Sequence, residues 1–193
     1  MNISRHSLWG LVSLIAFSPA SARSAGMDHF TQGDVEVTVT RAPEKRLDFE
    51  VVVPASRAEV WKAFTTSEGM TSWIAPNAKV DLKIGGPWEV GFAGAAPGGG
   101  TILSFLPMQM LSVHAMAPEK FPTVRRDRTQ AVFLFQEVDA GHTRVTLSQI
   151  GWQSGEEWDK AFDYLSTGNA QLLEMLFYRF SKGPVRWDQA PPK

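Results

Sequence analysis

The chain has 193 residues with 19 basic and 20 acidic side chains, a formal net charge of −1 at pH 7. This balance argues against a strongly charged partner such as nucleic acid. The sequence contains no cysteine, which excludes a disulfide framework, a thiolate nucleophile and a zinc site with cysteine ligands.

The first 22 residues have the pattern of a secretory signal peptide. Arg5 and His6 precede an apolar run from 8 to 17 that is too short to cross a bilayer, and Ala-Ser-Ala at 20–22 fits a small-residue cleavage site. We therefore predict cleavage after Ala22 and a periplasmic or secreted mature protein. A membrane anchor and a buried N-terminal helix are the alternatives.

Residues 23–46 are predicted to form an N-terminal extension that contains one extra strand. From 35 to 40, valines alternate with polar residues, which is the period of a strand with one wet face. A second strand runs from 47 to 53 and stops at Pro54, because the missing amide of proline would break a ladder of hydrogen bonds.

A short helix and then a series of strands follow. Ser56 and Glu59 have the spacing of a capping box, which predicts a helix start, and Trp73 lies in a further helical turn or a loop. Beyond it, short alternating segments are separated by turns and by a long polar loop after 116. Strands are expected at 80–84, 88–92, 102–106, 111–116, 130–138 and 144–150.

The last long stretch, 154–182, is predicted to be one amphipathic helix. Ser154 and Glu157 indicate a capping box at its start, while Gly183 and Pro184 end it. Its apolar residues recur at spacings of three, four and seven, so they form one stripe that must be buried against the sheet. The stripe comprises Trp158, Phe162, Leu165, Leu172, Leu176 and Phe180.

Several segments together resemble the SRPBCC, or START-like helix-grip, superfamily. They are Pro-Ala-Ser at 54–56 with Val-Trp at 60–61, the D-x-x-x-G-G-x-W stretch at 81–88, and Gly-x-Thr-Arg-Val-Thr-Leu at 141–147. The pattern is most similar to the branch named after the activator of the ninety-kilodalton heat-shock protein ATPase (homologue 1-like, related to polyketide cyclases).

This resemblance implies an α+β helix-grip fold for 47–183, with 184–193 as a tail. A curved antiparallel sheet would wrap around the long C-terminal helix, with short helices after the first core strand and an apolar cavity between sheet and helix. Two departures from the branch concern that cavity. Gly-Asn at 168–169 stands where a tryptophan is usual, and His-Ala at 114–115 replaces Thr-Trp. The identity of the ligand therefore does not carry over.

The side chains expected to line the cavity come from the strands, the long helix and the edges of loops. Tryptophans at loop edges can equally well fill a core. The expected lining residues are Trp73, Ile84, Trp88, Val90, Phe105, His114, Leu134, Leu147, Trp152, Trp158, Phe162 and Leu165.

The residues give no support for turnover. His114 is the only histidine inside a predicted element, and nothing beside it completes a base with an orienting partner, so it is a ligand contact or a structural histidine. The acids at 156–159 suit the start of a helix. Gly-Gly-Gly at 98–100 lacks the lysine and helix of a phosphate loop, and no metal-binding spacing occurs. We expect no catalytic residue, metal or cofactor.

The sequence has one basic cluster, in the long polar loop. The simpler interpretation is that it is a solvated loop. The alternative is that it makes a weak contact with an anionic membrane surface. No aromatic residues alternate with these cations, which argues against nucleic acid. The cluster comprises Lys120, Arg125, Arg126 and Arg128.

The function that the sequence favours is exported, non-catalytic binding of a small hydrophobic or amphipathic molecule in the cavity between sheet and helix. One alternative is a polyketide-cyclase-like or hydrolase-like enzyme that uses the same cavity, because the superfamily also contains such enzymes and fold alone does not decide function. The other is an interaction protein like the chaperone ATPase activator, against which the signal peptide argues.

Overall fold

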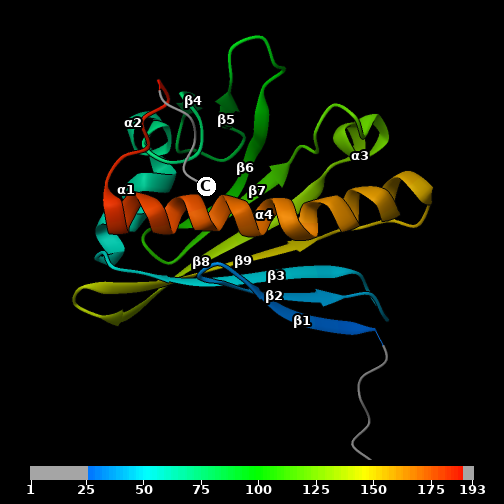
Figure 1. The fold of residues 1–193 in the computed structure, drawn as a ribbon. Coiled ribbons are helices and arrows are strands. Elements are labelled where there is room, and N and C mark those ends of the chain that lie inside the picture. The colour runs from blue at the N-terminus through cyan, green and yellow to red at the C-terminus, as the bar shows by residue number, and fades with distance from the viewer. Residues whose placement is uncertain (1–25, 189–193) are drawn as a thin grey trace, which may run out of the picture.

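The computed structural model describes residues 26–188, so the predicted signal peptide lies outside the described residues. Nine antiparallel strands form one sheet in the order β1-β2-β3-β9-β8-β7-β6-β5-β4, and a long helix crosses one face of it (Figure 1). The predicted α+β helix-grip fold is confirmed. The strands are β1 (Met27–Gln32), β2 (Val35–Thr40), β3 (Arg46–Val53), β4 (Asn77–Val80), β5 (Pro87–Gly91), β6 (Gly98–Leu106), β7 (Met110–Ala115), β8 (Thr129–Asp139) and β9 (His142–Ile150). The helices are α1 (Arg57–Thr65), α2 (Ser67–Thr71), α3 (Pro122–Asp127) and α4 (Glu156–Lys182).

The alternation of apolar and polar residues gives the sheet one buried face. Val37 pairs with Phe49, and Phe49 pairs with Leu147, so these three side chains share the inner face and are almost fully buried. On the opposite face Arg144 donates from Nε to Glu50 at 2.8 Å. Because a slip of one residue would exchange the two faces, this pattern fixes the register of β2, β3 and β9.

Helix α4 packs its apolar stripe against β2 and β3. Leu165, Leu172 and Phe180, which were predicted within the stripe, lie at its edges and are only partly buried. The fully covered positions are Trp158, Ala161, Phe162, Ala170, Leu173 and Leu176.

The predicted capping box of α4 is wrong. The helix begins after Gly155, which has a φ of 128° and provides no side-chain cap. Glu157 instead accepts hydrogen bonds from the backbone amides of Thr123 and Val124, at 2.6 and 3.1 Å. The carboxylate therefore fastens α3 to α4 rather than capping its own helix.

The other predicted capping box is confirmed. The Ser56 amide donates to Glu59 at 3.0 Å, and the Ser56 hydroxyl accepts from the Glu59 amide at 3.4 Å. The structure differs from the predicted elements in three places. β1 and α3 were not predicted, and residues 81–86 form turns, so that the strand expected at 80–84 ends at Val80.

Tryptophans fill the interior where α1 and α2 cover the sheet. The indole nitrogen of Trp73 donates to the Ala63 carbonyl at 3.0 Å, and that of Trp88 donates to the Phe64 carbonyl at 2.8 Å. The ring of Phe64 lies 4.9 Å from Trp73 and 5.0 Å from Phe133 between centroids. These two tryptophans are core residues with satisfied polar atoms.

The segment after α4 folds back onto α2. The Val185 amide donates to the Ser72 carbonyl at 2.9 Å, and Val185 itself is buried. Trp187 donates from its indole nitrogen to the Thr71 carbonyl at 2.6 Å and packs edge-on against Phe92. None of the helices between 26 and 188 is long and apolar enough to cross a membrane.

Candidate functional site

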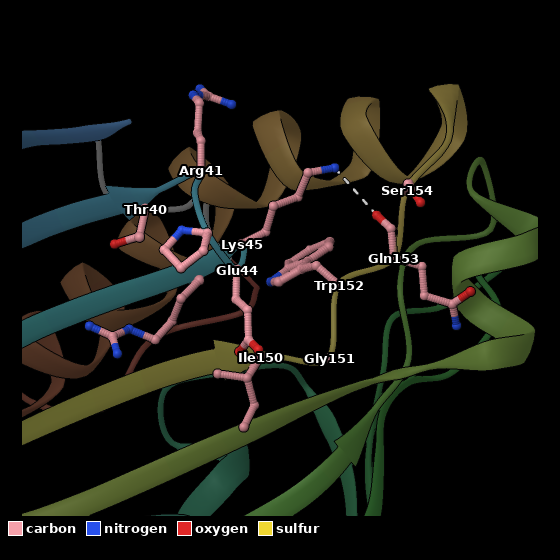
Figure 2. A pocket seen from close by; sticks show the side chains of 11 residues that line it. Thr40, Arg41, Glu44, Lys45, Ile150, Gly151, Trp152, Gln153 and Ser154 are labelled. Carbon is pink, nitrogen blue, oxygen red and sulfur yellow. Dashed lines mark hydrogen bonds between the residues drawn. The ribbon is translucent and has the colours of Figure 1, made fainter. Parts of the chain in front are cut away.

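A groove of about 810 Å³ lies at one end of the sheet, between the β2–β3 turn and the connection from β9 to α4 (Figure 2). Residues between 40 and 46 form one wall, and residues 150–154 form the other. Gly151 has a φ of 82°, a conformation that favours glycine, and it turns the chain out of β9 toward the groove.

Trp152 forms the apolar part of the groove wall. Its indole nitrogen donates to the Gln149 carbonyl at 3.0 Å. Its ring meets Phe162 and Trp158 edge-on, with centroids 5.1 and 6.3 Å apart. Trp152 is only partly buried, so it contacts the core on one side and lines the groove on the other.

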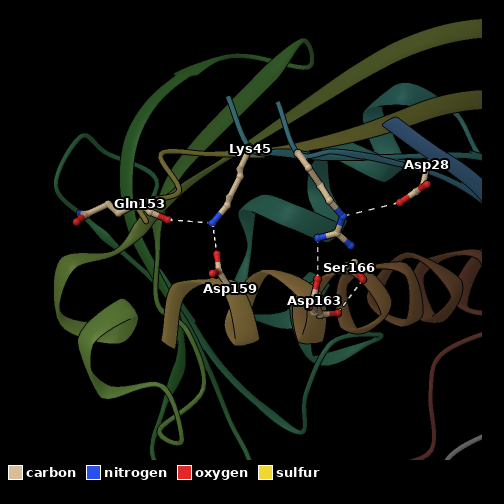
Figure 3. Close-up of polar contacts among 7 residues, drawn as sticks. Asp28, Lys45, Gln153, Asp159, Asp163 and Ser166 are labelled. Carbon is tan, nitrogen blue, oxygen red and sulfur yellow. Dashed lines mark hydrogen bonds and ion pairs between the residues drawn. The ribbon is translucent and has the colours of Figure 1, made fainter. Parts of the chain in front are cut away.

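Two cations tie the β2–β3 turn to α4 beside the groove (Figure 3). Lys45 pairs with Asp159 and also donates to the Gln153 carbonyl at 3.3 Å. Arg41 pairs with Asp163 at 2.9 Å. We call Arg41, Lys45, Asp159 and Asp163 the clasp. Because its positive and negative charges balance, the clasp adds no net charge to the groove.

The clasp lies over an aromatic ring. The Arg41 guanidinium is 5.3 Å from the centroid of Phe162, and the Lys45 ammonium is 6.0 Å away. Beside them, Thr40 lines the groove, and its hydroxyl oxygen is buried and has no hydrogen-bond partner among the described residues.

The structure places nine of the twelve expected lining residues in or against the core. Val90, Phe105, Trp152 and Leu165 are partly buried, and only Trp152 of this set also lines the groove. The fully buried members are Trp73, Trp88, Leu147, Trp158 and Phe162.

The other three expected lining residues do not face the helix. Ile84 is 74% exposed because the chain turns there instead of continuing β4. His114 and Leu134 are exposed, and each follows a buried neighbour, Val113 or Phe133. Since side chains alternate along a strand, His114 and Leu134 lie on the outer face of the sheet.

The basic cluster surrounds α3, and three of its four members make polar contacts. Arg125 donates to the carbonyls of Ala117 and Pro97, at 2.8 and 2.6 Å. Arg126 binds Asp127, and Arg128 reaches the His114 carbonyl at 3.4 Å. The fourth, Lys120, sits 3.3 Å from the centroid of the Tyr164 ring.

The titratable groups near the start of α4 serve structural roles. Burial acts to raise the pKa of Glu157, but the hydrogen bonds from Thr123 and Val124 outweigh it, so its pKa lies below the ordinary value. Between residues 26 and 188, no three His, Asp or Glu side chains are grouped so that they could hold a metal ion.

Apart from Trp152, the groove residues were missed at the sequence level because their signal is spread over distant positions. The cations of the turn sit more than a hundred positions before their partners on α4. A second missed feature lies on the inner side of the sheet, where the side chains of Asn169, Gln149 and Thr129 are joined by hydrogen bonds.

Comparison with known proteins gives one family. The family model described as activator of Hsp90 ATPase homolog 1-like protein matches residues 54–177. No curated protein matches the chain.

Solved structures share the fold at low sequence identity. The Aha1 dimer from Colwellia psychrerythraea has a TM-score of 0.59 at 17% identity, covering 72% of this chain and 97% of that one. Protein MLL2253 from Mesorhizobium loti has a TM-score of 0.58 at 17% identity, covering 68% and 93%. DynU16, a protein in the dynemicin biosynthetic locus, has a TM-score of 0.57 at 17% identity, covering 74% and 49%.

Proposed function

Because this chain belongs to the activator of Hsp90 ATPase homolog 1-like family, we propose that it uses the helix-grip fold to bind a small amphipathic molecule. The ligand enters through the groove between the β2–β3 turn and the start of α4, and the protein does not transform it. The protein acts outside the cytoplasm.

The groove is the observation that carries this proposal. Its volume of about 810 Å³ falls in the range of small-molecule sites. Its wall combines the indole of Trp152 with polar groups at the rim, which suits a ligand that has an apolar body and a polar end. Trp152 also contacts the buried Phe162, so a ligand against the indole lies next to the sheet–helix interior.

The polar groups of the groove support binding rather than turnover. Lys45 and Arg41 are held by carboxylates of α4, so neither is a free base or nucleophile. An enzyme would need an acid or base aimed at the ligand, with a third group to orient it. The cyclase-like or hydrolase-like alternative therefore predicts consumption of the ligand, whereas the proposal predicts its recovery unchanged.

The proposed periplasmic or secreted location rests on residues 1–22 and is tested separately. N-terminal sequencing of the protein from the periplasm or medium should show a chain that starts at Arg23. Recovery of an uncleaved chain from the cytosol would overturn export. It would also revive the alternative that the name of the family suggests, an interaction with a chaperone ATPase.

The binding test compares two partly buried tryptophans. Calorimetric titration with naphthol and dodecanol should give micromolar or tighter binding that Trp152→Phe weakens severalfold. Trp61→Phe is the matched control, because Trp61 also packs edge-on against a phenylalanine, Phe135, but is not among the residues that line the groove. The proposal would be contradicted if Trp152→Phe bound these ligands as tightly as wild type. It would also be contradicted if wild type bound nothing in a panel of lipids, sterols and quinones.

A further inference from the structure

Three aliphatic side chains from neighbouring strands lie side by side on the outer face of the sheet. Leu106 of β6 pairs with Met110 of β7, and Met110 pairs with Leu134 of β8. Residues that pair directly across strands point to the same face, and Leu134 lies on the outer one. Leu106 is 53% exposed and Leu134 is 48% exposed. We call Leu106, Met110 and Leu134 the apolar row, and the fold leaves it uncovered.

A hollow of about 730 Å³ lies along the apolar row, and all three members of the row line it. The rest of its lining includes two ion pairs, Arg144 with Glu50 at 2.8 Å and Arg57 with Glu137 at 3.6 Å. Both cations are arginines, and no lysine among the described residues lines the hollow. Apolar side chains next to polar groups, with arginine in place of lysine, are typical of protein–protein interfaces.

Met108 stands beside the hollow in a backbone position that does not suit a methionine. The Gln109 amide donates to the Leu106 carbonyl at 2.9 Å, which closes a turn with Pro107 and Met108 as its central residues. Met108 has a φ of 58°. A turn with proline at the first central position and a positive φ at the second is of type II, which favours glycine or asparagine at the second position. The side chain of Met108 is nevertheless 41% exposed, so burial in the core does not explain it.

Met108 and the hollow make this surface complementary to itself. Leu106 and Met110, two positions before and after Met108, both line the hollow, so an exposed flexible side chain stands next to a recess. In a contact between two copies related by a twofold axis, the same surface is used by both. The Met108 side chain of each copy can then enter the hollow of the other, and methionine adapts well to an irregular gap.

We propose that the outer face of β6, β7 and β8 is the interface of a symmetric homodimer, in which Met108 of each copy enters the hollow of the other. The apolar row forms the centre of the contact, and the two ion pairs of the hollow lie at its rim. The groove beside Trp152 shares no residue with this hollow, so the dimer does not depend on the proposed function.

The charges of the hollow favour a second copy over a charged partner. Its lining has two arginines and two glutamates, so a strongly acidic or basic partner would meet like charges as often as opposite ones. A second copy brings the same balanced set, and each side can therefore supply an acid for an arginine of the other. The chain has a formal net charge of only −1, so two copies repel each other weakly.

The test is the oligomeric state of the purified protein. Sedimentation velocity on wild type should show a monomer–dimer equilibrium with a dissociation constant of roughly 10 µM or tighter. Met108→Asn should raise this constant about tenfold or more, because it removes the side chain that enters the hollow. Since asparagine tolerates a positive φ, the substitution should not lower the melting temperature of the dilute, monomeric protein.

A second variant tests the apolar row, and a control tests another exposed side chain. Leu134→Thr keeps a residue that suits a strand and should also weaken the dimer about tenfold. The control is Phe30→Thr. Phe30 is 37% exposed, close to Met108, but it pairs with the buried Val37 on the edge strand β1 and so lies on the inner face. This substitution should leave the dissociation constant unchanged.

Three results would overturn the proposal. Wild type that sediments as a monomer at all soluble concentrations would mean that the outer face serves a different partner or none. A dimer that Met108→Asn and Leu134→Thr both leave intact would be formed by another surface. A dimer that Phe30→Thr dissociates would be formed at the β1 edge. None of these results bears on the groove, whose role the titrations with naphthol and dodecanol decide.

Discussion

At the scale of the residue, the clasp shows how little each exposed ion pair contributes. Lys45 is mostly covered, while its partner Asp159 is largely exposed, and Arg41 and Asp163 are both about half exposed or more. Such pairs gain modest Coulomb energy and lose side-chain freedom. The clasp therefore positions the β2–β3 turn more than it stabilises the fold.

A double-mutant cycle measures this contribution. Lys45→Met and Asp159→Asn, alone and together, should give a coupling free energy of about 0.2–1 kcal/mol in urea unfolding. The coupling should shrink in 1 M salt, because the screening length falls to roughly 3 Å. A coupling free energy of several kcal/mol that does not change with salt would show that the pair behaves as a buried ion pair.

Leu173 is the residue by which the phase of α4 can be tested. It is fully buried, whereas the neighbouring Gln171 is exposed. Leu173→Ala should lower the free energy of unfolding by about 2–5 kcal/mol, and Gln171→Ala should change it by less than about 0.5 kcal/mol. Leu172→Ala should fall between them because Leu172 is only partly buried. A larger loss of stability in Leu172→Ala than in Leu173→Ala would mean that the buried stripe is shifted by one residue.

At the scale of the element, the attachment of α3 to α4 depends on a carboxylate. Both amides donate to Oε1 of Glu157, these hydrogen bonds are stronger when the carboxylate is ionised, and the folded-state pKa of Glu157 is accordingly lowered. A group with a lowered pKa stabilises the fold above its unfolded pKa and loses that contribution as pH falls through the folded value.

The lowered pKa of Glu157 determines how the stability of the protein should change with pH. Glu157→Gln should destabilise the protein near pH 6, and the difference from wild type should shrink as pH falls below about 4, where the carboxylate of wild type is protonated. Urea midpoints for both proteins at several pH values provide the measurement. As a matched change on the same turn, Glu156→Gln should have little effect, because Glu156 pairs only with the exposed Lys160. A stability difference between Glu157→Gln and wild type that grows as pH falls would contradict this role for Glu157.

The elements that were predictable are those whose signal is local. The alternating valines of β2 and the stripe of α4 follow from side-chain period alone, and the Ser56 capping box needs only four residues. α3 was missed because Glu157, some thirty positions away, supplies the acceptors for its first amides. The capping box at Ser154 was wrong for the same reason, since the tertiary partner of Glu157 outcompetes its own helix start.

The candidate site was predictable only in part. Trp152 was expected to line it, but the cations of the clasp depend on pairings with α4 that sequence spacing does not reveal. His114 and Leu134 were expected on the inner face because the apolar character of their strands is not strictly alternating. Which residues of β7 and β8 face inward is fixed by the pairing of these strands with each other and of β8 with β9.

At the scale of the whole molecule, the segment after α4 closes the fold over α2. Ending the chain after Gly183 removes the buried Val185 and the indole of Trp187. This truncation should lower the free energy of unfolding by roughly 1.5–3 kcal/mol, the value of burying one such aliphatic side chain. Unchanged stability of the truncated form would mean that this closure is dispensable.

The pairing of β3 with β9 joins early and late parts of the chain, as the bond between Arg144 and Glu50, 94 positions apart, makes plain. A ribosome needs roughly 5–20 s to add that many residues. During this time β3 has no partner on one side, and no local contact replaces it. In a nascent chain with this topology, the sheet therefore cannot close against β3 until β9 has been made.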